Sequence, residues 1–136
     1  MSPLPPRPAG PLARHFLAEY YGCDPARLDD PAVVEAWVRG AAAAARTTLL
    51  QVVMHRFAPQ GVSGVAILAE SHLAIPPGPE HGFASIELYV CGAGGDPAAG
   101  DAWLRRELAP AHVELRALER GDPALLARYA MRAPSA

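Results

Sequence analysis

The segment TTLLQVVMHRFAPQGVSGVAILAES, residues 47–71, decides the fold because it holds two strand-like runs joined by a turn. β-Branched and other apolar residues dominate residues 47–57 and again residues 62–71, and such residues favour extended structure. The APQG stretch between the runs has the proline and glycine that are typical of a turn. The segment therefore predicts a β-hairpin.

Alternating side chains predict a sheet with two unlike faces. Residues 13–21 and 111–119 are also strand-like, although a short helix would fit the first of these, and residues 83–91 alternate most clearly. One predicted face is apolar and carries Leu50, Val52, Met54, Ile86, Leu88 and Val90. The other predicted face is mixed and carries Gln51, His55, Phe57, Glu87, Tyr89 and Cys91.

Two Asp-Pro pairs mark the starts of two helices. An aspartate accepts hydrogen bonds as an N-cap, and proline is favoured at the first helical position. Asp30 and Asp96 are each followed by proline, which predicts helices over residues 31–46 and from Pro97 to about Leu108. Apolar residues at helical spacing support the first helix: Val33, Val34, Trp37, Val38, Ala41 and Ala42.

These elements predict an α+β fold, a two-layer sandwich of a mostly antiparallel sheet with two helices on one face. Their order is β-α-β-β followed by β-α-β, which resembles two related halves. Residues 1–12 are expected to be a flexible leader, 13–120 the domain, with a turn over 22–30, and 121–136 a partly helical tail. The face without helices needs a partner or forms a site, and we expect a homodimer that packs through it.

Composition excludes several classes of function. The chain has 136 residues and a net charge of −2, so it offers no electrostatic case for binding nucleic acid or an anionic membrane. No apolar run reaches the roughly 20 residues of a membrane span, and we expect a cytoplasmic protein. Cys23 and Cys91 lack the spacing of a metal site, and we expect reduced thiols and no bound metal.

All twelve basic residues are arginine. Because pyridoxal phosphate is held by a lysine, a chain without lysine cannot bind that cofactor as an internal Schiff base. Any carbonyl that serves this protein as an electron sink must come from another source.

The Glu70-Ser71 pair offers such a source. A serine hydroxyl can attack the carbonyl of the preceding peptide bond where the backbone is strained and the oxyanion is stabilised. The ester that forms can eliminate, which cuts the chain and leaves dehydroalanine, and hydrolysis then gives a pyruvoyl group. The carbonyl would in this way derive from the protein itself.

The sequence resembles the S-adenosylmethionine decarboxylase proenzyme family in its short bacterial and archaeal form. The resemblance covers roughly residues 12 to 120. It is carried by ARHFLAEYYGCD, HRFAPQGVSGV, AESHL, PEHGFASIELYVCG and the Asp-Pro pair that opens the second helix. It implies a pyruvoyl-dependent decarboxylase that produces decarboxylated S-adenosylmethionine for spermidine biosynthesis.

The resemblance also implies roles in self-processing and catalysis. Cleavage falls between Glu70 and Ser71, so that Ser71 becomes the pyruvoyl cofactor. Ser63 assists this cleavage. Cys91 donates a proton to the product carbanion, and a thiol is a suitable general acid.

The same resemblance implies residues that bind the small-molecule substrate. Phe57 stacks on adenine, and an aromatic ring also suits a neighbouring sulfonium. Glu80 holds the ribose hydroxyls, because a carboxylate accepts two hydrogen bonds. His55 is a further substrate-binding candidate on the same face as Phe57.

One position departs from the family's pattern. The family carries a histidine five residues after the serine, where this chain has Pro76, and Gly78 and His81 replace a tryptophan and a tyrosine. That histidine is implicated as the base for elimination, and proline offers no proton acceptor. His55, His72 and His81 are the candidates to replace it.

Two other functions stay open at this point. The changed loop also fits a pyruvoyl-dependent decarboxylase of ornithine or arginine, in which Glu80 or Glu87 would face the distal cation. Alternatively, the chain stays uncut and modulates an active paralogue as a non-catalytic partner.

Overall fold

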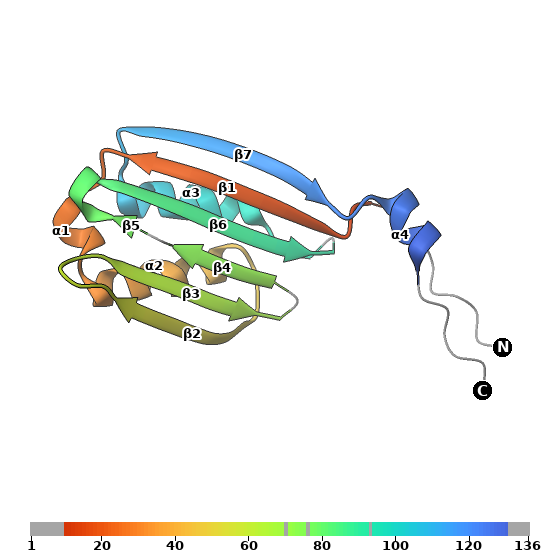
Figure 1. Cartoon of the computed structure of the whole chain (residues 1–136), viewed down its shortest axis with the longest axis horizontal. Helices are drawn as coiled ribbons and strands as arrows, with labels where there is room; N and C mark the ends of the chain where they lie inside the picture. The colour runs from red at the N-terminus through yellow and green to blue at the C-terminus, as the bar shows by residue number, and fades with distance from the viewer. Residues whose placement is uncertain (1–9, 70, 76, 93, 131–136) are drawn as a thin grey trace.

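A sheet and a layer of helices make up the molecule (Figure 1). The computed structural model describes residues 10–69, 71–75, 77–92 and 94–130. Its strands are β1 (Ala13–Tyr21), β2 (Leu49–Arg56), β3 (Val62–Leu68), β4 (Ser71–Ile75), β5 (Pro77–Gly78), β6 (Phe83–Cys91) and β7 (His112–Arg120). Its helices are α1 (Pro25–Leu28), α2 (Pro31–Ala44), α3 (Pro97–Leu108), α4 (Pro123–Tyr129) and the short 3-10 helix η1 (Pro79–His81).

The described strands build one antiparallel sheet. Six of them run in the order β2-β3-β4-β6-β1-β7, and β5 adds a short pairing to β6. The predicted hairpin is confirmed, because β2 pairs with β3. β1 is hydrogen-bonded on both sides: Ala13 lies opposite Cys91 of β6 and opposite Arg120 of β7. A strand from the start of the chain is thus inserted between two strands from its second half.

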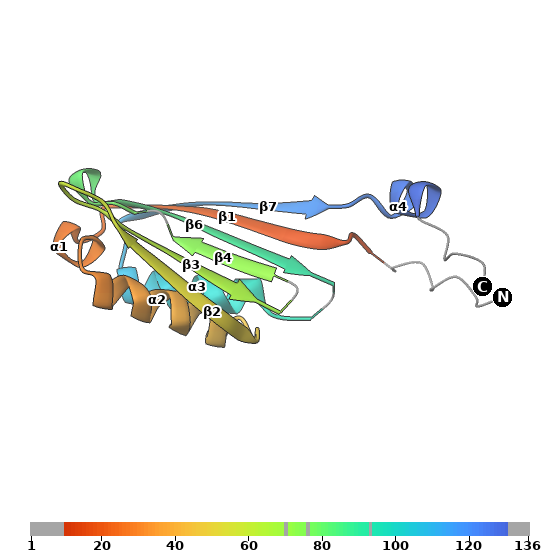
Figure 2. The ribbon, with the colours of Figure 1, turned by 60° about the horizontal axis from the view of Figure 1, so that its bottom comes forward.

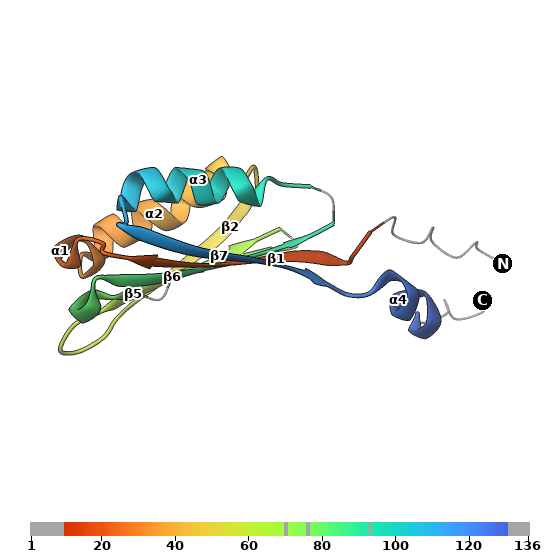
Figure 3. The ribbon, with the colours of Figure 1, turned by 90° about the horizontal axis from the view of Figure 1, so that it is seen from above.

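The two predicted long helices lie over one face of the sheet, as Figures 2 and 3 show for α2 and α3. The side chain of Asp30 accepts a hydrogen bond from the amide of Ala32, and that of Asp96 from the amide of Ala99, both at 3.0 Å. The largest fully buried side chains between the two layers are Trp37, Tyr20, Leu28, Leu73, Ile75 and Leu104. The predicted two-layer α+β sandwich is therefore confirmed. We call the sheet face away from α2 and α3 the open face.

The strand β4, which begins directly after Glu70, was not predicted from the sequence. The run from residue 62 to residue 71 was expected to be one strand followed by a loop, but β3 ends at Leu68 and Ser71 already lies opposite it in β4. Leu73 and Ile75 of β4 are fully buried. The two connecting residues, 69 and 70, include no glycine, proline, asparagine or aspartate, so the tight turn has no sequence signature.

Two smaller expectations were also wrong. The stretch over residues 22–30 contains the helix α1, because Asp24 caps it through the amide of Ala26 and proline follows the cap. Leu50 does not share the apolar face with Val52, because a shift of register after Leu49 turns it outward and leaves it 63% exposed.

None of the described helices is long and apolar enough to cross a membrane.

Gly40 of α2 packs directly against Trp103 of α3. A Cβ atom built at this position would overlap the indole ring of Trp103 in α3. The contact between the helices therefore depends on the absence of a side chain at residue 40.

We expect Gly40→Val to destabilise the protein by about 1–3 kcal/mol, because the added methyl groups force Trp103 out of its packing. Urea unfolding followed by circular dichroism measures this change. The matched control is Ala43→Val at an exposed position of the same helix, which should cost only about 0.5 kcal/mol. Equal losses for the two variants would contradict the packing explanation.

Candidate active site

The open face carries the polar and aromatic side chains that the alternation predicted. Glu87, Tyr89 and Cys91 lie on this face of β6, since their neighbours Ile86, Leu88 and Val90 are buried under the helices. His55 of β2 lies opposite Ser63 of β3, on the same face. Sequence reasoning on the strands therefore placed these side chains correctly.

A charged cluster crosses this face from β7 to β4. Arg120 Nη1 donates to His15 Nδ1 at 3.1 Å, and His15 Nε2 lies 2.7 Å from Glu87 Oε1. A guanidinium cannot accept a hydrogen bond, so Nδ1 must be the acceptor and the ring hydrogen lies on Nε2, where it is donated to Glu87. His72 Nε2 lies 3.6 Å from the same carboxylate oxygen, and its ring stacks on Tyr89 with centroids 5.2 Å apart.

Sequence reasoning missed two members of this cluster, His15 and Arg120. His15 is the buried polar residue of the described core, at 8% exposure. The alternation of side chains along its strand could place His15 on the same face as Glu87 and Tyr89, but only if the pairing of β1 with β6 were already known.

Ser71 and Cys91 lie at one end of the sheet, which we call the Ser71 end. Ser71 pairs with Val90, the residue before Cys91. The Ser71 hydroxyl is half-buried and donates to the carbonyl oxygen of Ala69 at 3.2 Å. The register places Ser71 on the helix-covered side, with Val90, and Cys91 on the open face, so in the intact chain the two side chains point to opposite sides. Glu70, the other residue of the expected cleavage site, lies outside the described residues.

The expected substrate-binding residues gather at the opposite end, which we call the Phe57 end. The rings of His55 and Phe57 meet edge to face, with centroids 4.4 Å apart. Gln60 Nε2 in the turn after β2 donates to Glu80 Oε2 at 3.3 Å, which ties η1 to that turn. Phe57 is 51% exposed, so its ring is free for a planar ligand.

The two ends are too far apart to form one site within a single chain. Ser71 lies opposite Leu68, and Ser63 lies five residues earlier in β3. At about 3.3 Å per residue in a strand, this separates the two serines by about 17 Å.

The three histidine candidates are divided in the same way. His72 follows Ser71 directly, whereas His55 and His81 lie at the Phe57 end, His81 with its Nε2 3.8 Å from Glu80 Oε1. Pro76, which replaces the expected histidine, lies outside the described residues.

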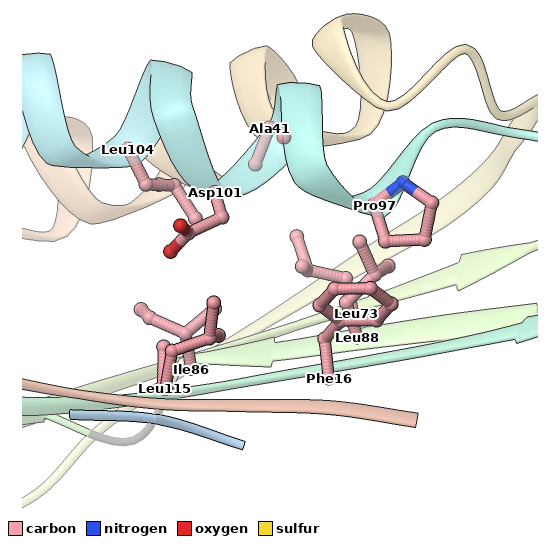
Figure 4. Close-up of a pocket in the computed structure, with 11 residues that line it drawn as sticks. Phe16, Ala41, Leu73, Ile86, Leu88, Pro97, Asp101, Leu104 and Leu115 are labelled. Carbon is pink, nitrogen blue, oxygen red and sulfur yellow. The ribbon is translucent and has the colours of Figure 1, made fainter. Parts of the chain in front are cut away.

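Two hollows in the structure differ in character. An apolar pocket lies between α3 and the sheet, where Leu104 and Asp101 face Ile86 and Leu115 (Figure 4). The Asp101 carboxylate there already accepts the hydroxyl of Tyr20, and burial raises the pKa of that hydroxyl. This pocket is a gap in the core, away from the candidate residues.

The second hollow lies on the open face beside the charged cluster. It is lined by Leu17, Ala18, Glu19, Ser85, Ile86, Glu87, Glu114 and Arg116. Its charged lining thus consists of three carboxylates, from Glu19, Glu87 and Glu114, and the guanidinium of Arg116. Within the described part of the chain, no group of three or more His, Cys, Asp and Glu side chains is arranged to hold a metal ion.

The family model, the similar sequences and the similar solved structure all point to the same protein family. The family model described as S-adenosylmethionine decarboxylase matches residues 14–121. An S-adenosylmethionine decarboxylase proenzyme of Parasynechococcus marenigrum (strain WH8102) is 43% identical over 116 residues, 85% of this chain and 91% of the relative. A protein of the same name from Prochlorococcus marinus (strain MIT 9313) is 42% identical over 125 residues, 92% of this chain and 99% of the relative.

A solved structure is also similar. The crystal structure of the adenosylmethionine decarboxylase from Aquifex aeolicus VF5 superposes with a TM-score of 0.78 and 31% sequence identity. The match covers 84% of this chain and 94% of that one.

The two thiols should differ in reactivity. Cys23 is 5% exposed and burial raises its pKa, whereas Cys91 is half-exposed on the open face. Because the thiolate is the reactive form, we expect iodoacetamide to modify Cys91 about tenfold faster than Cys23, or more. Peptide mass spectrometry over a time course measures both rates. A Cys91→Ala variant should retain only the slow reaction, and faster labelling of Cys23 would contradict the placement of these residues.

Proposed function

The chain belongs to the S-adenosylmethionine decarboxylase family, and from that premise we propose that it decarboxylates S-adenosylmethionine with a pyruvoyl group made from its own Ser71. The family consists of pyruvoyl-dependent carboxy-lyases. The observation that carries the proposal is the position of Ser71, directly after a two-residue connection between β3 and β4 and at the same end as Cys91. Because the chain has no lysine to hold pyridoxal phosphate, a carbonyl derived from Ser71 would supply the electron sink.

Self-processing begins with the Ser71 hydroxyl. Its oxygen attacks the carbonyl carbon of residue 70, the peptide C–N bond breaks, and an ester and a free amino group form. A base then removes the α-proton of residue 71, the Cβ–Oγ bond breaks, and the carboxylate of residue 70 leaves. Hydrolysis of the dehydroalanine releases ammonia and leaves the ketone. His72 is the candidate base at the Ser71 end, because it directly follows Ser71 and its imidazole is paired with the Glu87 carboxylate.

The sheet tolerates a cut at this position. β3 stays hydrogen-bonded to β2, and β4 stays hydrogen-bonded to β6. β1 from the first fragment remains held between β6 and β7 of the second. The two fragments, residues 1–70 and 71–136, therefore stay together after the bond is broken.

The pyruvoyl group, once formed, supplies an electrophilic carbonyl that binds the substrate amine and accepts the electrons that carbon dioxide leaves behind. Cleavage also removes the tether of residue 71 to residue 70, so that this end of β4 can turn toward the open face. There the Cys91 thiol delivers a proton to the α-carbon of the product.

A homodimer completes the site. Ser63 lies about 17 Å from Ser71 within one chain, and Phe57 and Glu80 lie at the same end as Ser63, too far from Ser71 to act on the same substrate molecule. A two-fold axis through the open face brings the Phe57 end of one copy over the Ser71 end of the other and forms two equivalent sites. The same contact covers the apolar side chains that the open face exposes, which include Val53, Val65, Ile67 and Leu118.

In this arrangement the second copy holds the nucleoside. The exposed face of Phe57 stacks on adenine and attracts the sulfonium charge, and the Glu80 carboxylate accepts the ribose hydroxyls. His55 sets the angle of the Phe57 ring through their edge-to-face contact. Ser63, opposite His55, reaches the cleavage bond of the other copy.

We expect the purified protein to give two masses that correspond to a cut before Ser71 and to release labelled carbon dioxide from S-adenosylmethionine. Ser71→Ala should give one full-length mass and no activity, because it removes the hydroxyl that attacks the peptide bond. Intact mass spectrometry and the release assay measure both. One uncut mass in the wild-type protein would refute the proposed cofactor, and release from ornithine or arginine instead would refute the substrate.

A Pro76→His variant tests the departure from the family's pattern. It should cut faster than the wild-type chain, because the imidazole adds a proton acceptor. An unchanged rate would show that the base lies elsewhere.

Mixed dimers test whether the site is shared between two copies. Cys91→Ala and Glu80→Ala should each lose most activity alone, yet co-expression should restore about a quarter of wild-type activity, since each mixed dimer holds one intact site. The matched control pairs Cys91→Ala with Ser71→Ala, which lie at the same end and should not complement. No recovery in the first pair would contradict the two-fold arrangement.

A further inference from the structure

The helix α4 is the described element with the least support from its own chain. None of its residues is buried, and it spans only seven residues. Asp122 caps it by accepting the amides of Ala124 and Leu125 at 2.8 and 3.2 Å. A helix this short is not stable in water on its cap alone, so packing against another surface would stabilise it.

α4 presents an apolar pair outward. Leu125 and Tyr129 are four residues apart, which places them on one face of the helix, and they are 53% and 70% exposed. Leu126 faces the chain's own body, since a Cβ atom on Gly121 would lie 3.3 Å from its Cδ1. The side of α4 that holds Leu125 and Tyr129 is therefore free for a partner.

The position of α4 limits which partner this is. Arg120 pairs with Ala13, and Ala13 pairs with Cys91. The strands β7, β1 and β6 therefore all have one terminus at the Ser71 end, and α4 begins just beyond it. It projects past the end of the sheet in Figure 1, and Figures 2 and 3 show it on the side away from α2 and α3. A molecule that packs on the open face and extends past this end of the sheet therefore meets α4.

We propose that α4 docks on a second copy of this chain, with Leu125 and Tyr129 against the surface around Phe57 and the following turn. The inference rests on the proposed function, in which the Phe57 end of one copy covers the Ser71 end of the other. That surface offers a matching apolar group in Pro59, which lies in the exposed turn after Phe57. α4 therefore extends the dimer contact and borders the nucleoside site of the other copy.

Two charged substitutions test the contact. Leu125→Glu combined with Tyr129→Glu should weaken the dimer about tenfold or more in sedimentation equilibrium, because the apolar face no longer packs. The matched control, Ala124→Glu combined with Ala130→Glu, adds the same charge at exposed positions of the same segment and should leave the dimer unchanged. An unchanged dissociation constant in the first variant would overturn the proposal.

A photocrosslink locates the contact in the full-length protein. p-Benzoylphenylalanine in place of Tyr129 should link two copies and map to the segment from residue 55 to residue 61 or to η1. Links within one chain only, or to other segments of the second copy, would overturn the proposal.

The two proposals fail separately. A wild-type chain that stays uncut and releases no carbon dioxide refutes the proposed function. A cut, active dimer that loses no affinity with the Leu125 and Tyr129 substitutions refutes only the role of α4.

Discussion

The hydrogen-bond ladders on both sides of β1 are the interaction on which the rest of the structure depends. β1 pairs with β6 along eight residues, from Ala13 with Cys91 to Tyr20 with Ala84, and it pairs along its whole length with β7. These ladders join a strand from the first half of the chain to two strands from the second half. If the connection between β3 and β4 were cut as proposed, these ladders would hold the fragments together, because β1 belongs to the first fragment and β6 and β7 belong to the second. The proposed cut after residue 70 is compatible with this interleaved topology.

The alternation of side chains along β6 places its core-packing residues on one face of the sheet and its polar and thiol side chains on the other. Ile86, Leu88 and Val90 fix the strand under α2 and α3, while Glu87, Tyr89 and Cys91 project from the open face. The Glu87 carboxylate is held by the hydrogen bond from His15, which is itself fixed by Arg120 of β7. The groups on the open face are thus oriented by strands that pack firmly on the other side.

The length of the sheet is the reason for proposing a site shared between two copies. The Ser71 end holds Ser71 and the Cys91 thiol, the Phe57 end holds Phe57 and Glu80, and five residues of β3 separate Ser63 from Ser71 by about 17 Å. In the proposed dimer, a two-fold axis through the open face brings the unlike ends of the two copies together. The exposed apolar side chains on that face and on α4 fit the same arrangement.

Local signals in the sequence determined much of the fold. The caps Asp30 and Asp96 determined both long helices, and the alternation in residues 83–91 determined which side chains share a face, because these patterns act over a few neighbouring residues. The start of β4 at Ser71 escaped prediction, since its turn has no distinctive residues and the strand depends on pairing with β3 and β6. Only the tertiary structure decided that His15 and Arg120 meet Glu87, and that Ser71 and Phe57 lie at opposite ends. Register between strands distant in sequence is set by the packing of the whole sheet, which no local pattern encodes.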